Sequence, residues 1–383
     1  MSDAAKTLYV NGLARLLIAG LLAILLPTGC YPRPDEEGMT KNLQTQDITH
    51  IPPAMLKEAN LRQAWSARLP LGPDRSVKRI FYHNGQLYVL NDHNLLYALD
   101  GSSGNIIWSQ QLPAPLAICS DPQYYQDNIL FVISDNFVQI RESDGRILEE
   151  KKINFTVSTN AARSENLLFL GSNDRRFYCL NLINDVALWQ NPCSAKPIGN
   201  VTVSDDKVFF VTEDYNLFVS RLDRRELVWS HKAFGTLTGV VVEQNQCYLP
   251  SADTVLYCFD AAKGVQLWRY LAGGRLRELP VLTDSAVYQH VDQKALLCLE
   301  RQPDSENGQL RWELNYGRCL LAENGDFSYC LTLDDELAIL NNLTGKPVLT
   351  FYIPHVDLVA QNNEDAYIFL ASKNGNILTL RPN

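Results

Sequence analysis

Short hydrophobic runs alternate with turn-forming residues along the chain from about residue 60 onward. The runs at 86–90, 207–211 and 366–370 are rich in the β-branched and aromatic side chains typical of strands. Eight turn signals separate such runs, at His83-Asn84-Gly85, Asp127-Asn128, Glu165-Asn166, Asp205-Asp206, Gln244-Asn245, Asp284-Ser285, Asn324-Gly325 and Asn363-Glu364. Asn-Gly favours a tight hairpin, because both central residues of a type I′ turn need a positive φ. The pattern predicts consecutive β-hairpins.

The tryptophans mark a repeat that runs in step with these turns. They stand at Trp65, Trp108, Trp189, Trp229, Trp268 and Trp312. Two further copies of the repeat have Glu149 and Leu349 at the same place, four residues after a glycine, just as Trp108 follows Gly104. The eight positions lie 37 to 44 residues apart, which is the length of one four-stranded propeller blade. Each period holds two hairpins, and therefore four strands.

The two ends of the repeat indicate how the blades close into a ring. The last period stops after its third strand, at 376–380, whereas Trp65 belongs to a fourth strand without a blade of its own. Pairing residues 64–69 with the C-terminal strand completes the eighth blade and removes exposed sheet edges. We therefore expect residues 61–383 to form an all-β, eight-bladed propeller of four-stranded antiparallel blades. Each tryptophan is expected to fill the wedge between adjacent blades; the alternative is that the rings stack on a ligand.

The N-terminal segment differs from the rest of the chain. A basic lead with Lys6 and Arg15 is followed by an uncharged run from Leu16 to Gly29, shorter than a membrane span but typical of a signal peptide. Two small residues precede Cys30, an arrangement that resembles a bacterial lipobox, although Pro27 replaces the usual leucine. We expect residues 1–29 to be a lipoprotein signal peptide and Cys30 to carry lipid. The alternatives are an uncleaved anchor helix or an ordinary cleaved signal peptide.

Composition and charge narrow the classes of partner. Residues 30–60 are polar and proline-rich, so we expect a flexible tether between lipid and propeller. The chain carries a net charge of −9, and removal of residues 1–29 takes away two basic residues and one acidic residue, which leaves −10. Nucleic-acid binding needs clustered Lys and Arg, and the sequence has no such cluster. We expect no nucleic-acid partner.

The repeat resembles that of the quinoprotein (PQQ)-like propellers, whose pattern is Ala-x-Asp-x-x-Thr-Gly-x-x-x-Trp. Residues 98–108 and 259–268 carry the resemblance, which extends over residues 60–383. Within that superfamily the chain is similar to the BamB-like lipoproteins in lipobox, tether, blade number and length. This resemblance implies a non-catalytic periplasmic scaffold of the machinery that assembles outer-membrane β-barrel proteins. It assigns no partner-contact residue.

A second branch of the superfamily holds quinone-dependent dehydrogenases, which need a bound quinone and a calcium ion. Those enzymes use a disulfide between adjacent cysteines, and this sequence has no adjacent cysteines. The even repeat length leaves little room for insertions that would build a deep pocket. The motifs HExxH, CxxC, GxSxG and the P-loop are also absent from the sequence. We expect no enzyme activity, no cofactor and no metal.

Several polar residues allow both a structural and a functional interpretation. His83 and His93 fall in predicted turns, where solvated histidines are common. The run Asp334-Asp335-Glu336 is a candidate cation site but is more simply a solvated turn. Arg275 and Arg277 mark either a loop that faces a partner or an ordinary connection between blades.

The other eight cysteines allow disulfides if the chain is exported to an oxidising compartment. Cys319 and Cys330 are equidistant from the Asn324-Gly325 turn, and Cys247 and Cys258 are symmetric about residues 252–253. Directly opposed residues lie within disulfide range, so we expect these two pairs to be candidate bridges. The alternative is that all four are small buried hydrophobic residues. A bridge between Cys179 and Cys193 has a less favourable register.

Two functional classes remain after these exclusions. The first is an assembly or scaffolding lipoprotein of the bacterial cell envelope, facing the periplasm from the outer membrane, with protein partners that include the β-barrel assembly machinery. The second is a periplasmic binding module for a small ligand or a polysaccharide. Tyr31 follows the lipidated cysteine where aspartate would favour retention in the inner membrane, which agrees with an outer-membrane location.

Overall fold

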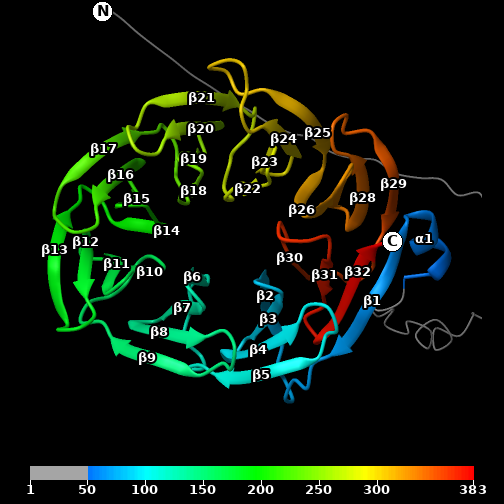
Figure 1. Cartoon of the computed structure of the whole chain (residues 1–383), viewed down its shortest axis with the longest axis horizontal. Helices are drawn as coiled ribbons and strands as arrows, with labels where there is room; N and C mark the ends of the chain where they lie inside the picture. Colours follow the sequence, from blue (N-terminus) through cyan, green and yellow to red (C-terminus); the bar gives the residue numbers. More distant parts are fainter. Residues whose placement is uncertain (1–50) are drawn as a thin grey trace, which may run out of the picture. The chain divides into compact units, whose positions relative to one another are not determined.

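The computed structural model describes residues 51–383, which form a closed ring of eight four-stranded antiparallel sheets (Figure 1). In each of blades 1 to 7 the strands follow one another from the centre of the ring to its rim. Cys30, the signal peptide and the tether up to residue 50 lie outside the described residues. The predicted eight-bladed propeller is confirmed.

The first four blades follow one another in the sequence, each listed here from its innermost strand outward. Blade 1 consists of β2 (Val77–His83), β3 (Gln86–Asn91), β4 (Leu95–Asp100) and β5 (Ile106–Gln111). Blade 2 consists of β6 (Gln123–Tyr125), β7 (Asn128–Ile133), β8 (Asn136–Arg141) and β9 (Ile147–Lys152). Blade 3 consists of β10 (Ala162–Ser164), β11 (Leu167–Ser172), β12 (Arg176–Asn181) and β13 (Val186–Pro192). Blade 4 consists of β14 (Pro197–Ser204), β15 (Lys207–Thr212), β16 (Asn216–Arg221) and β17 (Leu227–Lys232).

The remaining blades continue in the same order, and the last one takes its outer strand from the N-terminal side. Blade 5 consists of β18 (Val241–Glu243), β19 (Gln246–Pro250), β20 (Val255–Asp260) and β21 (Gln266–Leu271). Blade 6 consists of β22 (Val281–Leu282), β23 (Ala286–Val291), β24 (Ala295–Glu300) and β25 (Leu310–Asn315). Blade 7 consists of β26 (Gly317–Asn324), β27 (Phe327–Thr332), β28 (Glu336–Asn341) and β29 (Pro347–Tyr352). Blade 8 consists of β30 (Leu358–Ala360), β31 (Ile368–Ala371), β32 (Asn376–Pro382) and β1 (Leu61–Arg68).

Ring closure follows the predicted pairing. Strand β1 pairs antiparallel with β32, with Trp65 opposite Thr379 and Leu61 opposite Pro382 (Figure 1). The blade that joins the two ends of the described chain therefore has four strands like the others. Strand β1 thereby pairs the outer edge of β32, which would otherwise be exposed.

A short helix, α1 (Pro53–Glu58), precedes β1. Pro53 suits the first helical position, because its missing N–H has no partner there in any helix. Ile51, Leu56 and Ala59 are buried against blades 7 and 8. The expected flexible tether over 30–60 therefore does not include its last residues, which fold onto the propeller because their apolar side chains complete its core.

Eight apolar clusters hold the ring together, one at each junction between neighbouring blades. The middle strands supply most of them, since their side chains are buried on both faces, as in the pattern of β3, β7 and β11. Contacts between neighbouring blades thus stabilise the structure. A substitution in one cluster is expected to weaken mainly the junction that contains it.

Candidate functional site

The six tryptophans all lie on outermost strands and dock one blade onto the next. Five indole Nε1 groups donate a hydrogen bond to a backbone carbonyl of the following blade: Trp65 to Gly101 (2.8 Å), Trp108 to Glu142 (2.7 Å), Trp189 to Leu222 (2.9 Å), Trp229 to Ala261 (3.0 Å) and Trp312 to Asn342 (2.7 Å). At four of these five tryptophans the repeat glycine of the following blade lies against the ring, as Gly104 does on Trp65, and leaves no room for a side chain. Blade 4, which follows Trp189, has Arg225 at the glycine position. The rings are therefore inter-blade contacts rather than platforms for a ligand.

The tryptophan of blade 5 departs from this pattern. Trp268 is 2 % exposed, but its Nε1 has no hydrogen-bond partner among the described residues. Arg301 occupies the position of the residue whose carbonyl accepts in the other blades, and its side chain is buried. The Arg301 guanidinium donates to the carbonyl oxygen of Thr283 (2.8 Å) and contacts Glu243 (3.4 Å).

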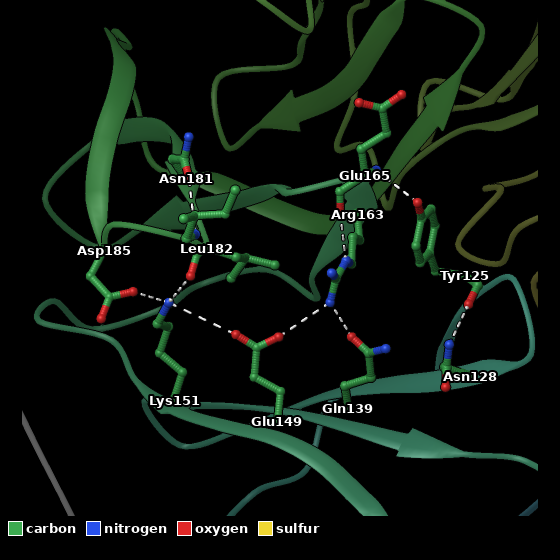
Figure 2. Close-up of polar contacts among 11 residues, drawn as sticks. Tyr125, Asn128, Gln139, Glu149, Lys151, Arg163, Glu165, Asn181, Leu182 and Asp185 are labelled. Carbon is green, nitrogen blue, oxygen red and sulfur yellow. Dashed lines mark hydrogen bonds and ion pairs between the residues drawn. The ribbon is translucent and has the colours of Figure 1, made fainter.

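Ionic contacts replace the tryptophan between blades 2 and 3 (Figure 2). Glu149 stands at the tryptophan position and contacts Arg163 of blade 3 (3.2 Å). Two residues after Glu149, the Lys151 ammonium donates a hydrogen bond to the carbonyl oxygen of Leu182 (3.1 Å). Leu182 occupies the repeat position whose carbonyl accepts the indole hydrogen bond in other blades. Lys151 also pairs with Asp185, which stands where five other blades have the repeat glycine.

The last junction without a tryptophan is that of blades 7 and 8. Leu349 takes the tryptophan position there and belongs to the same apolar cluster as Met55 and Leu56 of α1. The helix thus supplies part of the apolar contact that a tryptophan supplies elsewhere.

A cavity of about 970 Å³ opens on the face of the ring where the segments between blades lie, which we name the linker face. These segments carry the chain from the outer strand of one blade to the inner strand of the next. Because the strands of a blade alternate in direction, the turn between its second and third strands also lies on the linker face. The cavity is lined from several blades by Leu116, Ser134, Thr156, Asn160, Asn200 and Arg277, among others. It combines hydroxyl and amide groups with an apolar edge.

Strongly exposed apolar side chains gather on the linker face. Leu116 and Ile118, in the segment that enters blade 2, are 81 % and 82 % exposed, and Phe234, in the segment that enters blade 5, is 87 % exposed. Leu116 and Ile118 also line the cavity. Exposed apolar side chains beside a polar cavity are typical of interaction sites. The signal in the sequence was the apolar run around Pro115 in a predicted loop, which was not recognised.

Charged residues edge the cavity on the side of blade 6. Arg277 contacts Asp292 at 3.3 Å, and its side chain is 58 % exposed. Glu278 accepts a hydrogen bond from His290, which lowers the pKa of the Glu278 carboxyl. Of the two arginines singled out in the sequence, Arg277 lines the cavity and Arg275 is not among its lining residues.

The strand register contradicts the two expected disulfides. Cys258 faces Tyr248 rather than Cys247, and Cys330 faces Leu320 rather than Cys319. An offset of one residue sends neighbouring side chains to opposite faces of a sheet. Each pair is accordingly divided between two different junction clusters, and all eight cysteines of residues 51–383 are free thiols.

The remaining candidates do not assemble into a site. His83 lies between Glu142 (3.5 Å) and Glu364 (3.4 Å), His93 contacts Asp92 (2.8 Å), and Asp334 and Asp335 lie in a turn of blade 7. Within residues 51–383 no group of three or more His, Cys, Asp or Glu side chains is arranged to hold a metal ion. No helix in that range is long and apolar enough to cross a membrane.

Comparison with known proteins agrees with this architecture. The family model described as "Outer membrane protein assembly factor BamB" matches residues 54–152, 140–233 and 218–348. The solved structure of BamB from Moraxella catarrhalis is similar, with a TM-score of 0.61, 14 % identity, and coverage of 84 % of this chain and 97 % of that one. The computationally designed Ika8 protein has a TM-score of 0.65 at 12 % identity, over 82 % of this chain and 98 % of that one. No curated protein sequence matches the chain. With the family model matched over most of its length, the chain belongs to the BamB family of PQQ-like repeat propellers.

Proposed function

We propose that this protein is a non-catalytic lipoprotein scaffold of the bacterial cell envelope, anchored at Cys30 and facing the periplasm, that takes part in the assembly of outer-membrane β-barrel proteins. Membership of the BamB family supports a role in the envelope and protein partners in general. The observation that carries the proposal is the exposed apolar surface at the cavity edge of the linker face. Burial of Leu116 and Ile118 in a partner would contribute roughly 1.5–3 kcal/mol for each side chain.

Co-purification tests the docking face with matched variants. Leu116→Asp with Ile118→Asp places charges on the linker face, whereas Ile183→Asp with Leu343→Asp places them on the opposite face, where the two side chains are 74 % and 71 % exposed. We expect the first pair to lose the barrel-assembly partner and the second pair to retain it. Equal retention by both pairs would reject the linker face as the docking surface.

The anchor is tested on the same protein. We expect mass spectrometry of the mature protein to find a lipidated N-terminus at Cys30, and Cys30→Ala to release a folded propeller from the membrane fraction. An unmodified Met1 would contradict the anchor without affecting the assignment of the docking face.

A second candidate function is binding of a small ligand or a polysaccharide in the cavity. The serine, threonine and asparagine side chains among its lining residues favour this alternative, because they can hydrogen-bond a polyhydroxylated ligand. Native mass spectrometry of protein purified under mild conditions distinguishes the two. A retained glycan or small molecule supports the binding module, and a retained membrane-protein partner supports the scaffold.

A further inference from the structure

The apolar cluster between blades 2 and 3 has the fewest buried members of the eight and contains no tryptophan. Its buried members are Leu130, Val132, Phe137, Ile153, Ala161, Leu168 and Leu170. The junctions of blades 8 and 1, 1 and 2, 4 and 5, and 5 and 6 each bury more residues, and all of them include a tryptophan in the cluster or packed against it. The junction of blades 7 and 8 is the other one without a tryptophan, but its cluster has the most buried members of the eight. Of these two junctions, that of blades 2 and 3 therefore gains less from the hydrophobic effect.

Charged side chains form ion pairs between blades 2 and 3 at the place where other junctions have a tryptophan (Figure 2). Glu149 lies between Arg163 and Lys151, and Lys151 reaches Asp185 and the carbonyl oxygen of Leu182 in blade 3. Arg163 also donates to Gln139 of blade 2, and its guanidinium lies over the Tyr125 ring, 5.3 Å from the centroid. The network thus contains two carboxylates and two cations that cross from one blade to the next.

These ionic contacts respond to the solvent in a way that a tryptophan contact does not. The Asp185 side chain is 68 % exposed, so its pairing with Lys151 is open to screening by salt. Ion pairs also cross two other junctions, Arg79–Asp121 between blades 1 and 2 and Arg301–Glu243 between blades 5 and 6, but a tryptophan is buried in the apolar cluster of each. Moderate concentrations of a simple salt do not weaken those apolar contacts. Rising ionic strength should therefore loosen this junction selectively.

Blade 8, where the ring closes, has more extensive contacts with its neighbours than blades 2 and 3 have with each other. Strand β1 forms a full ladder with β32, and α1 adds Ile51, Leu56 and Ala59 to the cluster between blades 7 and 8, which is the largest of the eight. Blade 8 is therefore held on one side by that cluster and on the other by the contact of Trp65 with blade 1.

From these contacts we propose that the ring opens between blades 2 and 3, not at the closure of blade 8, and that ionic strength sets how often it opens. The segment that joins blades 2 and 3 includes Thr156 and Asn160, which line the cavity on the linker face. Opening of this junction therefore changes the shape of the cavity. The proposal concerns the conformation of the ring and holds whichever partner the linker face binds.

Thiol labelling with readout by site-resolved mass spectrometry tests where the ring opens. Ala161→Cys places a thiol in the cluster between blades 2 and 3, and Ala371→Cys places one in the cluster between blades 8 and 1; both alanines are buried. Native thiols serve as references in the same sample, since Cys119, Cys179, Cys247, Cys258, Cys298 and Cys319 belong to the clusters of the six other junctions. An unstructured cysteine peptide corrects for the effect of salt on the chemistry.

We expect the thiol at position 161 to react about tenfold faster than the thiol at position 371, and to gain a further three- to tenfold between about 0.01 M and about 1 M NaCl. The reference thiols should keep their rates. Equal or faster reaction at position 371, or a rate at position 161 that does not change with salt, would overturn the proposal.

Lysine variants and an unmodified amide test the ionic control. Lys151→Met should raise the low-salt labelling rate at position 161 towards its high-salt value and reduce the salt dependence, because only the Arg163–Glu149 ion pair remains across the junction. Lys152→Met, at the exposed neighbour, should change neither. The native chain offers a readout that needs no substitution, because the Glu165 amide donates to the Tyr125 hydroxyl across the junction (2.8 Å). Hydrogen exchange of this amide should accelerate with salt, and an unchanged rate would contradict the proposal even if a variant failed to fold.

Discussion

The indole Nε1 of Trp65 donates a hydrogen bond to the carbonyl oxygen of Gly101 at 2.8 Å, and thereby joins blade 8 to blade 1. The same bond recurs at four further junctions, whereas the Trp268 indole has no partner among the described residues. The two tryptophans are similarly buried, at 8 % and 2 % exposure, so they form a natural comparison.

Phenylalanine substitutions measure the value of this bond. Trp65→Phe removes the donor and leaves the Gly101 carbonyl unpaired, while Trp268→Phe removes an N–H that is already unpaired. Because an intramolecular hydrogen bond contributes about 1 kcal/mol net, we expect Trp65→Phe to lower the free energy of unfolding by about 1 kcal/mol more than Trp268→Phe. Chemical denaturation of both variants gives the difference, and equal losses would contradict this role of the indole.

Helix α1 should contribute directly to stability. Leu56→Ala removes a side chain that is 7 % exposed within the cluster between blades 7 and 8. We expect a loss of about 2–5 kcal/mol in the free energy of unfolding, as for other buried leucines. Glu58→Ala, on the exposed side of the same helix, is the control and should change it by less than about 0.5 kcal/mol. A loss no larger for Leu56→Ala than for Glu58→Ala would show that the helix does not belong to the folded body.

Glu300 should make part of the stability depend on pH. Arg311 donates to both of its carboxylate oxygens, at 2.8 Å and 2.7 Å, and holds the pKa of the carboxyl below its usual range. A lowered pKa in the folded state stabilises the protein above the ordinary glutamate pKa, near 4.3, and this contribution is lost as the pH falls through the lowered value. The stability difference between the native chain and Glu300→Gln should therefore be constant at neutral pH and shrink on acidification. Glu150→Gln, at an exposed site, is the control, and a difference that grows in acid would contradict the assignment.

The thiols of the folded ring should be unreactive and unbridged. Burial raises the pKa of Cys258 and Cys298 to about 12, and the thiolate is the reactive form. We expect non-reducing peptide mapping of protein from the envelope to recover Cys247, Cys258, Cys319 and Cys330 unpaired, with rapid alkylation only after denaturation. A peptide that links Cys319 to Cys330 would show that the strand register differs from the one described here.

The blade repeat could be predicted from the sequence because it rests on local chemistry repeated eight times. Most repeats contain the turn residues, the alternating strands and the glycine four residues before the tryptophan position, as at Trp108 and Trp268. The closure by β1 followed from counting strands, since Trp65 had no blade of its own. These features depend on the period and not on the exact position of any one turn.

The disulfides could not be predicted because they depend on the exact register. The hairpin that follows Cys319 turns one residue later than the Asn-Gly signal indicates, since Asn324 pairs with Phe327, and a bulge after Leu320 shifts the register again. In the hairpin that contains Cys247 and Cys258, Pro250 pairs with Leu256, so an odd number of residues lies in the turn. An odd number places Cys258 opposite Tyr248 rather than opposite Cys247. Each difference amounts to one residue, and one residue is enough to move a cysteine to the opposite face of its sheet.

The candidate site was only partly visible in the sequence. Arg277 was recognised as part of a loop that could face a partner, whereas Leu116, Ile118 and Phe234 were not. The sequence does not distinguish an apolar loop residue that is buried under its own blade from one that is exposed, because tertiary packing decides between the two. Helix α1 was missed for a similar reason, because a six-residue helix in a proline-rich segment forms only where the ring provides an apolar surface for it.

The most direct test of the central claim, that the linker face docks a protein partner, is site-specific photo-crosslinking in cells. A photoreactive amino acid in place of Ile118 probes the linker face, and one in place of Leu343 probes the opposite face. The account predicts a single strong adduct with a barrel-assembly protein from position 118 and none from position 343. An adduct confined to position 343, or no protein adduct from position 118 while the lipoprotein remains in the membrane fraction, would contradict it.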